Sequence, residues 1–182
     1  MFIPQPGLAS AKNKWVNTVD SNNPQVLGKA HYIIENNLYC TLSTCSPDGF
    51  PWVSPVFFVY DCEIGYNIYW CSATAAKHSQ NIYQNQGRVA VTIFDSSVAE
   101  GTGGGLYFYG SASELNPDQI ERVFKLMASR ANKQINRTVD DYLNGSARRL
   151  YHFQPEQAWI TGERLPVGNQ LVDTKIQINL PK

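Results

Sequence analysis

Residues 69–82 read YWCSATAAKHSQNI, and they carry the strongest indication of the fold. A strand-like run from Asn67 to Cys71 gives way to small hydroxyl-bearing residues, and Lys77 and His78 then open a predicted helix. A strand that leads through such a turn into a helix start gathers backbone N–H donors, hydroxyl groups and positive charge. The stretch therefore predicts a phosphate-binding site.

The candidate phosphate ligands are Ser72, Thr74, Lys77 and His78. Positive charge at a helix N-terminus is mildly unfavourable, by about 0.3–1 kcal/mol, so Lys77 and His78 are best explained by a bound anion. Asn81, one turn along, is either a neighbour of the phosphate or a solvated helix residue.

Composition narrows the class of protein. The chain has 182 residues, of which 43% are hydrophobic and 12% aromatic, typical of a globular β-rich protein. Formal net charge is zero, so no overall field favours nucleic acid or an anionic membrane as a partner. No apolar run is long enough to span a membrane, and the first residues lack a secretory pattern, so we expect a cytoplasmic protein.

The sequence contains no recognisable pattern for a metal site or for a hydrolytic active site. The cysteines at 40, 45, 62 and 71 form no CxxC pair, so we expect reduced, mostly buried thiols and no metal site. No Ser–His–Asp set and no paired carboxylates have usable spacing.

Periodicity predicts a mainly β protein. After an N-terminal arm over 1–23, we expect one domain over 24–182, with helices at 24–36, at 76–86 and from 117. The predicted strands cover 38–44, 52–60, 68–71, 89–94, 106–114, 150–153, 158–161 and 175–180. Six or seven antiparallel strands with short helices between them indicate a small β-barrel with flanking helices.

The order of these features resembles the pyridoxamine-phosphate-oxidase-like flavoproteins, the FMN-binding split-barrel family. The resemblance runs from about Val26 to the C-terminus and rests on five segments: 42–49, 51–58, 72 with 77–82, 103–107 and 157–160. It implies a homodimer with an FMN site between the subunits.

The resemblance also implies roles for individual residues. Ser54, Pro55, Val56 and Phe57 would lie along the isoalloxazine ring of FMN. The phosphate would be bound by Ser72, Lys77 and His78, and Trp159 would approach the flavin from the partner subunit.

The chain departs from true pyridoxamine-phosphate oxidases. Those enzymes place an arginine and a lysine on the second strand, where this chain has the uncharged run from Ser54 to Val59. Equivalents of the residues that hold pyridoxal phosphate are also absent, so the resemblance points to an uncharacterised branch.

The resulting expectation is an FMN-dependent oxidoreductase for a small organic substrate, with NADH or NADPH as a candidate electron donor. Because the cofactor carries the redox chemistry, no catalytic residue is assigned. Tyr107, Trp159 and Phe57 are candidates for the wall around the flavin. The alternatives are a non-catalytic flavin or haem carrier on the same barrel and a deazaflavin-dependent reductase.

Overall fold

A computed structural model describes residues 23–62, 65–132, 136–143 and 145–180. It contains the helices α1 (Pro24–Asn36), α2 (Lys77–Gln84) and α3 (Ile120–Arg130), and short 3-10 helices at Pro117–Gln119 and Val139–Tyr142. The strands are β1 (Tyr39–Cys45), β2 (Pro51–Asp61), β3 (Asn67–Ala73), β4 (Arg88–Phe94), β5 (Gly105–Glu114), β6 (Arg148–Thr161), β7 (Leu165–Val167), β8 (Gln170–Val172) and β9 (Lys175–Ile178). The predicted arm over 1–23 lies almost wholly outside the described residues.

Six of the strands close into an antiparallel barrel. Their order is β3-β2-β1-β4-β5-β6, and β6 pairs back with β3 to complete the ring. The seventh strand, β9, extends the sheet along the end of β6. The mainly β fold class, a split barrel of six to seven antiparallel strands, is confirmed.

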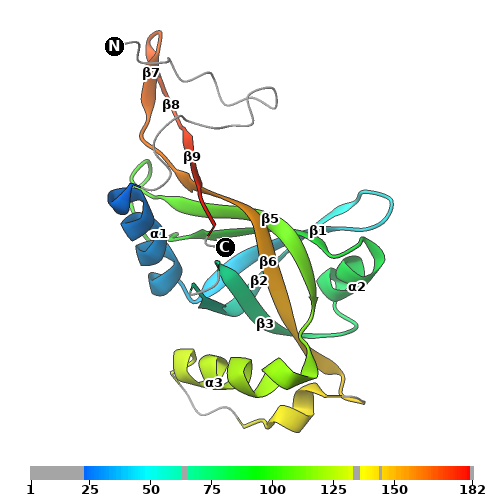
Figure 1. The fold of residues 1–182 in the computed structure, drawn as a ribbon. Helices are drawn as coiled ribbons and strands as arrows, with labels where there is room; N and C mark the ends of the chain where they lie inside the picture. Colours follow the sequence, from blue (N-terminus) through cyan, green and yellow to red (C-terminus); the bar gives the residue numbers. More distant parts are fainter. Residues whose placement is uncertain (1–22, 63–64, 133–135, 144, 181–182) are drawn as a thin grey trace.

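The helices cover different parts of this barrel. α1 and α2 lie on opposite sides of it, and α3 runs beneath it across β2 (Figure 1). Pro24 opens α1, and the Asn23 side chain accepts a hydrogen bond of 2.9 Å from the backbone N–H of Gln25. The buried residues of α1 and α3 are apolar, whereas those of α2 include Ser79 and Asn81.

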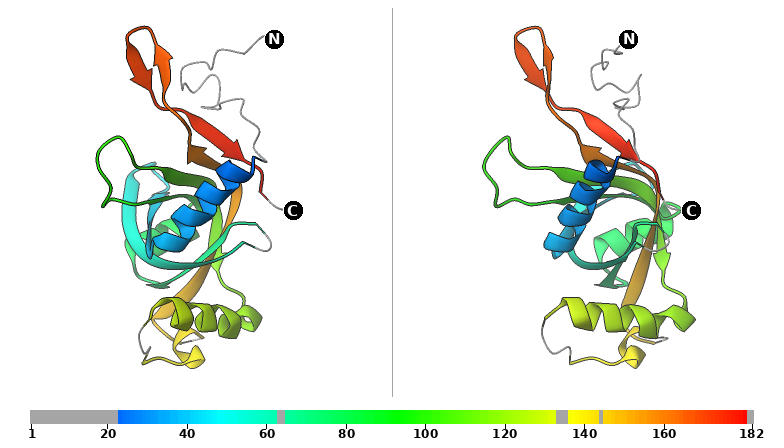
Figure 2. Two further views of the ribbon diagram at one scale, coloured as in Figure 1. Left: turned by 90° about the vertical axis from the view of Figure 1, so that its left-hand side faces the viewer. Right: turned by 60° about the vertical axis from the view of Figure 1, so that its left-hand side comes forward.

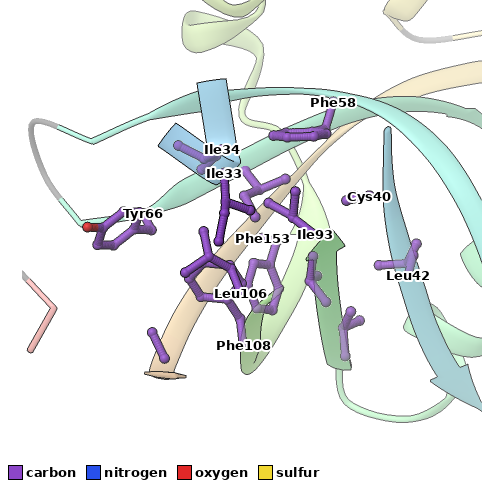
Figure 3. Close-up of a cluster of buried hydrophobic side chains, with 14 of the residues drawn as sticks. Ile33, Ile34, Cys40, Leu42, Phe58, Tyr66, Ile93, Leu106, Phe108 and Phe153 are labelled. Carbon is purple, nitrogen blue, oxygen red and sulfur yellow. The ribbon is translucent and has the colours of Figure 1, made fainter. Parts of the chain in front are cut away.

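The barrel interior is filled by alternate residues of the strands. Figure 3 shows Ile33 and Ile34 of α1 beside Phe58, Leu106 and Phe153, all of them buried. A second cluster under α3 contains Val59, Tyr69, Val123, Met127 and Tyr142. The two clusters lie on opposite faces of β3 and of the second half of β2, so these parts of the sheet are buried on both sides, whereas the first half of β2 is exposed.

The structure corrects one prediction about the strands. Residues 148–161 form the single strand β6, whereas the sequence pattern predicts separate strands over 150–153 and 158–161. Pairing with β5 shifts register between Tyr109 and Gly110, next to Pro155. Proline has no backbone N–H to donate, so the ladder bulges there and then resumes.

Beyond the barrel, β7 and β8 form a two-stranded ribbon that was not predicted. It projects away from the barrel (Figures 1 and 2). An ion pair of 2.8 Å between Arg164 and Asp173 joins its two ends.

Candidate flavin-phosphate site

The main candidate site is a cleft of about 690 Å³, here called cleft A. It lies beside β2 and β3, with residues from α3, the segment that follows α3 and the start of β6 along its other side. Its apolar lining consists of Leu38, Tyr39, Pro55, Val56, Phe57, Met127, Ala131 and Tyr142. The more polar lining residues include Cys71, Ser72, His78, Asn136, Arg137 and Arg148.

His78 is the central polar residue of cleft A. Its Nε2 atom lies 2.7 Å from Ser72 Oγ, and its Nδ1 atom lies 3.2 Å from Ser54 Oγ. Burial lowers the pKa of His78 below its ordinary value of 6.5. The neutral ring donates to one serine and accepts from the other. In the protonated ring both nitrogens donate, so each serine keeps its own hydroxyl hydrogen to donate to an anion.

The placement of His78 follows from how α2 packs. Ser79, Asn81 and Ile82 are buried, so this helix face is fixed against the barrel. At its start, the N-cap residue Ala76 makes no side-chain capping hydrogen bond. The first backbone N–H groups of α2 therefore have no side-chain acceptor at the cap, which suits an anion close to His78.

Two arginines that the sequence interpretation missed also line cleft A. Arg148 begins β6 and pairs with Ala73 at the end of β3, next to Ser72. Arg137 follows α3, and a hydrogen bond with the Tyr142 hydroxyl raises the pKa of Arg137. The Arg148–Arg149 doublet is visible in the sequence, but only the pairing of β6 with β3 brings it to Ser72.

Charge in cleft A has one sign. His78, Arg137 and Arg148 line it, and none of its described lining residues is an aspartate or glutamate. No carboxylate is ion-paired to either arginine within the part of the chain that the structure describes. The cleft therefore suits an anion next to an apolar surface.

Most of the predicted cofactor residues meet in this cleft. Pro55, Val56, Phe57, Ser72 and His78 line it directly, and Ser54 touches it through its hydrogen bond to His78. The structure thus brings together residues from β2, β3 and α2 that are separated in the sequence.

Several predicted residues lie elsewhere. Thr74 does not line cleft A, and its hydroxyl donates to the Ala147 carbonyl over 3.4 Å. Lys77 is exposed and contributes, after hydrogen bonds from Ser46 and Phe50, to the lowered pKa of Asp48 in the β1–β2 turn. Asn81 is buried under α2, where its Nδ2 atom donates to Thr44 Oγ1 over 3.0 Å. Trp159 lies outside cleft A, with its ring centroid 5.5 Å from that of Tyr109.

Other kinds of site find no support in the described residues. They contain no group of three His, Cys, Asp or Glu side chains that could hold a metal ion. In the same part of the chain, every helix is too short or too polar to cross a membrane.

The names of known structures with this fold refer to different functions. A protein of unknown function from Agrobacterium tumefaciens is 20% identical, with a TM-score of 0.63 over 86% of this chain, which spans 62% of that protein. The haem storage protein HutZ from Vibrio cholerae is 23% identical, with a TM-score of 0.58 over 72% of this chain and 91% of its own. A putative pyridoxamine 5'-phosphate oxidase from Listeria innocua is 19% identical, with a TM-score of 0.54 over 79% of this chain and 98% of its own.

No curated protein sequence matches the chain. The family model described as pyridoxamine 5'-phosphate oxidase matches residues 27–162, which include most of α1, the six barrel strands and all residues that line cleft A. The chain therefore belongs to the pyridoxamine 5'-phosphate oxidase family.

Proposed function

We propose that this protein is an FMN-dependent oxidoreductase that acts on a small organic substrate. Cleft A would hold the FMN phosphate at Ser72, His78 and Arg148, close to the N-terminus of α2. The isoalloxazine ring would lie along β2, against Pro55 and Phe57.

The observation that carries this proposal is the setting of His78. Its imidazole lies between two serine hydroxyls in a cleft that also has two arginines and an apolar wall. Phosphate needs several donors and positive charge, whereas a flavin ring needs an apolar surface. Cleft A supplies both, so the residues present fit FMN.

When bound, FMN would supply the transfer of a hydride or of single electrons. The chain's own residues would bind and orient it. The apolar side chains of cleft A would exclude water from one face of the ring, and the cations at the phosphate end would fix its position along β2.

A second copy of the chain is part of the proposal. The outward-pointing residues of β2, β1, β4, β5 and β6 form what we call the outer sheet face. Tyr39, Val53, Phe94 and Tyr109 on it are 61%, 57%, 49% and 41% exposed. Several exposed apolar side chains on one face mark an interaction surface, and this face continues from cleft A because Tyr39, Pro55 and Phe57 belong to both.

The first test is the identity of the bound cofactor. Purified protein should show the absorbance of oxidised flavin or acquire it when FMN is added, with one FMN per chain. Anaerobic bleaching by NADH or NADPH would then support an enzyme rather than a carrier. Failure to bind FMN at micromolar concentrations would refute the proposal.

Haem is the second candidate because His78 offers an imidazole and Arg137 and Arg148 could pair with carboxylates. One relative of the same fold is a haem storage protein. However, both ring nitrogens of His78 are already hydrogen-bonded to serines, and a haem ligand would have to break one of these bonds. A Soret band on addition of haemin, with no flavin binding, would favour this candidate. A deazaflavin-dependent reductase would instead bind the deazaflavin in preference to FMN.

A further inference from the structure

A second cleft, here called cleft B, has a volume of about 970 Å³. It is bounded by α1, the β4–β5 connection, the end of β6 and the start of β9. Tyr107 of β5 lines it together with Thr161 and Lys175. The FMN site proposed above does not include this cleft.

Tyr107 is held in a specific arrangement. The Lys175 ammonium lies 3.7 Å from the centroid of the Tyr107 ring, and the phenol oxygen lies 3.3 Å from Thr161 Oγ1. Burial opposes ionisation of this phenol, but the nearby positive charge of Lys175 and the hydrogen bond with Thr161 outweigh it and lower the pKa of Tyr107. Gly105 leaves room for the hydroxyl, since a Cβ atom there would lie 3.0 Å from it.

The strand register places Tyr107 and cleft A on one face. Across the outer sheet face, Pro55 pairs with Thr41, Thr41 with Thr92, and Thr92 with Tyr107. Pro55 and Tyr107 are separated by three strand spacings, a distance of about 14 Å. This is too far for Tyr107 to contact a ring that lies against Pro55 of the same chain.

A two-fold dimer can bring the two regions together. In one arrangement the two-fold axis runs parallel to the strands and passes between β1 and β4, at Thr41 and Thr92. Pro55 of each copy then lies opposite Tyr107 of the other copy. In the other arrangement the axis runs perpendicular to the strands, and cleft A of one copy faces cleft A of the other copy.

Charge favours the first arrangement. The charged side chains that line cleft A, Arg137 and Arg148, are both positive, so two copies of the cleft would repel each other. Cleft B contains Asp95, Glu163 and Asp173 beside its lysines and arginine, so it meets cleft A without this repulsion.

We infer that Tyr107 and Lys175 of one copy face the FMN held in cleft A of a second copy, where they bind an oxygen atom of the substrate. This inference rests on the proposed function. A phenol donor beside an ammonium group suits an oxygen that gains negative charge as the substrate is reduced, such as a carbonyl or nitro oxygen. The substrate class is therefore a small molecule that carries such an oxygen at its reacting end.

The test uses fluorescence of bound FMN, because phenol and indole groups next to a flavin quench it. All chains carry Trp159→Phe. The phenols of cleft A, Tyr39 and Tyr142, are unchanged in every variant, so a difference in fluorescence reports on Tyr107. One chain also carries Tyr107→Phe and keeps cleft A intact. The other keeps Tyr107 and carries His78→Ala with Arg148→Ala, so that it does not retain FMN.

The Tyr107→Phe homodimer loaded with FMN should fluoresce more strongly than the Trp159→Phe parent. Subunit exchange with excess of the second chain should restore the quenching, because each FMN then faces an intact Tyr107 across the interface. Fluorescence that stays high after verified exchange would overturn the inference while FMN binding, and so the proposed function, still holds. Absence of FMN binding by the wild-type protein would refute both.

Discussion

Replacement of His78 tests the phosphate site most specifically. His78→Ala removes the imidazole that lies 2.7 Å from Ser72 Oγ, and with it the charge-assisted hydrogen bond that leaves the serine hydroxyl free to donate to the phosphate. A hydrogen bond to a charged group contributes about 1.5–3 kcal/mol. Because His78 is only half-buried, we take the lower half of that range, which corresponds to a loss of FMN affinity of about 10–40-fold.

The assay compares FMN with riboflavin, which lacks the phosphate. Flavin fluorescence titrations should show a weaker FMN complex for His78→Ala, whereas riboflavin should bind both proteins with nearly the same affinity. The matched control is His152→Ala. His152 is also half-buried with a lowered pKa, but it bonds to Asn67 Oδ1 over 2.8 Å and stacks on Tyr69, outside cleft A.

Two results would refute the reasoning. One is an unchanged FMN affinity in His78→Ala with a normal melting temperature. The other is an equal loss for FMN and riboflavin, since His78 would then act on the cleft as a whole and not on the phosphate.

Further predictions concern pH, packing and assembly. Because the pKa of His78 is lowered from 6.5, its protonated form appears only below that pH. FMN affinity should therefore fall as pH rises from 5 to 8, by up to about tenfold per unit, and His78→Gln should flatten this slope. The unfolded chain binds the His78 proton more tightly, so unliganded protein should lose stability as pH falls below about 6.5, and urea unfolding across this range measures it. Gly110→Ala should destabilise the barrel by about 1–3 kcal/mol in urea unfolding, because its Cβ would lie 2.1 Å from a backbone carbonyl of β6, whereas a Cβ at Gly28 meets nothing and Gly28→Ala should not destabilise. Val53→Asp on the outer sheet face should yield monomers by light scattering, and Leu171→Asp, at the more exposed ribbon position, should not. A stable dimer of Val53→Asp would show that the interface lies elsewhere.

The fold was largely predictable from local patterns. Strand alternation, the Ser46–Gly49 turn and the helix start at Pro24 each depend on neighbouring residues, and each was placed within a few positions. The continuity of β6 was not predictable in this way, because a proline such as Pro155 normally ends a strand. Only the bulge opposite Gly110 shows how the pairing resumes.

The site was predictable only in part, for a related reason. Residues near the strand-to-helix junction, such as Ser72 and His78, are close in sequence and could be grouped from it. Arg137 and Arg148 reach the same cleft through long-range contacts of α3 and β6. The positions of Lys77 and Asn81 depend on how α2 is rotated about its axis. Neighbouring residues of a helix point in different directions, so the sequence alone did not show that Lys77 faces solvent and Asn81 faces the core.

The most direct test of the central claim is a titration of the wild-type protein with FMN, riboflavin and haemin under the same conditions. The account predicts one FMN per chain, bound at least tenfold more tightly than riboflavin because the phosphate contacts Ser72, His78 and Arg148. Haemin should give no stoichiometric Soret complex. Equal affinity for FMN and riboflavin, or a haemin complex that excludes FMN, would contradict the account.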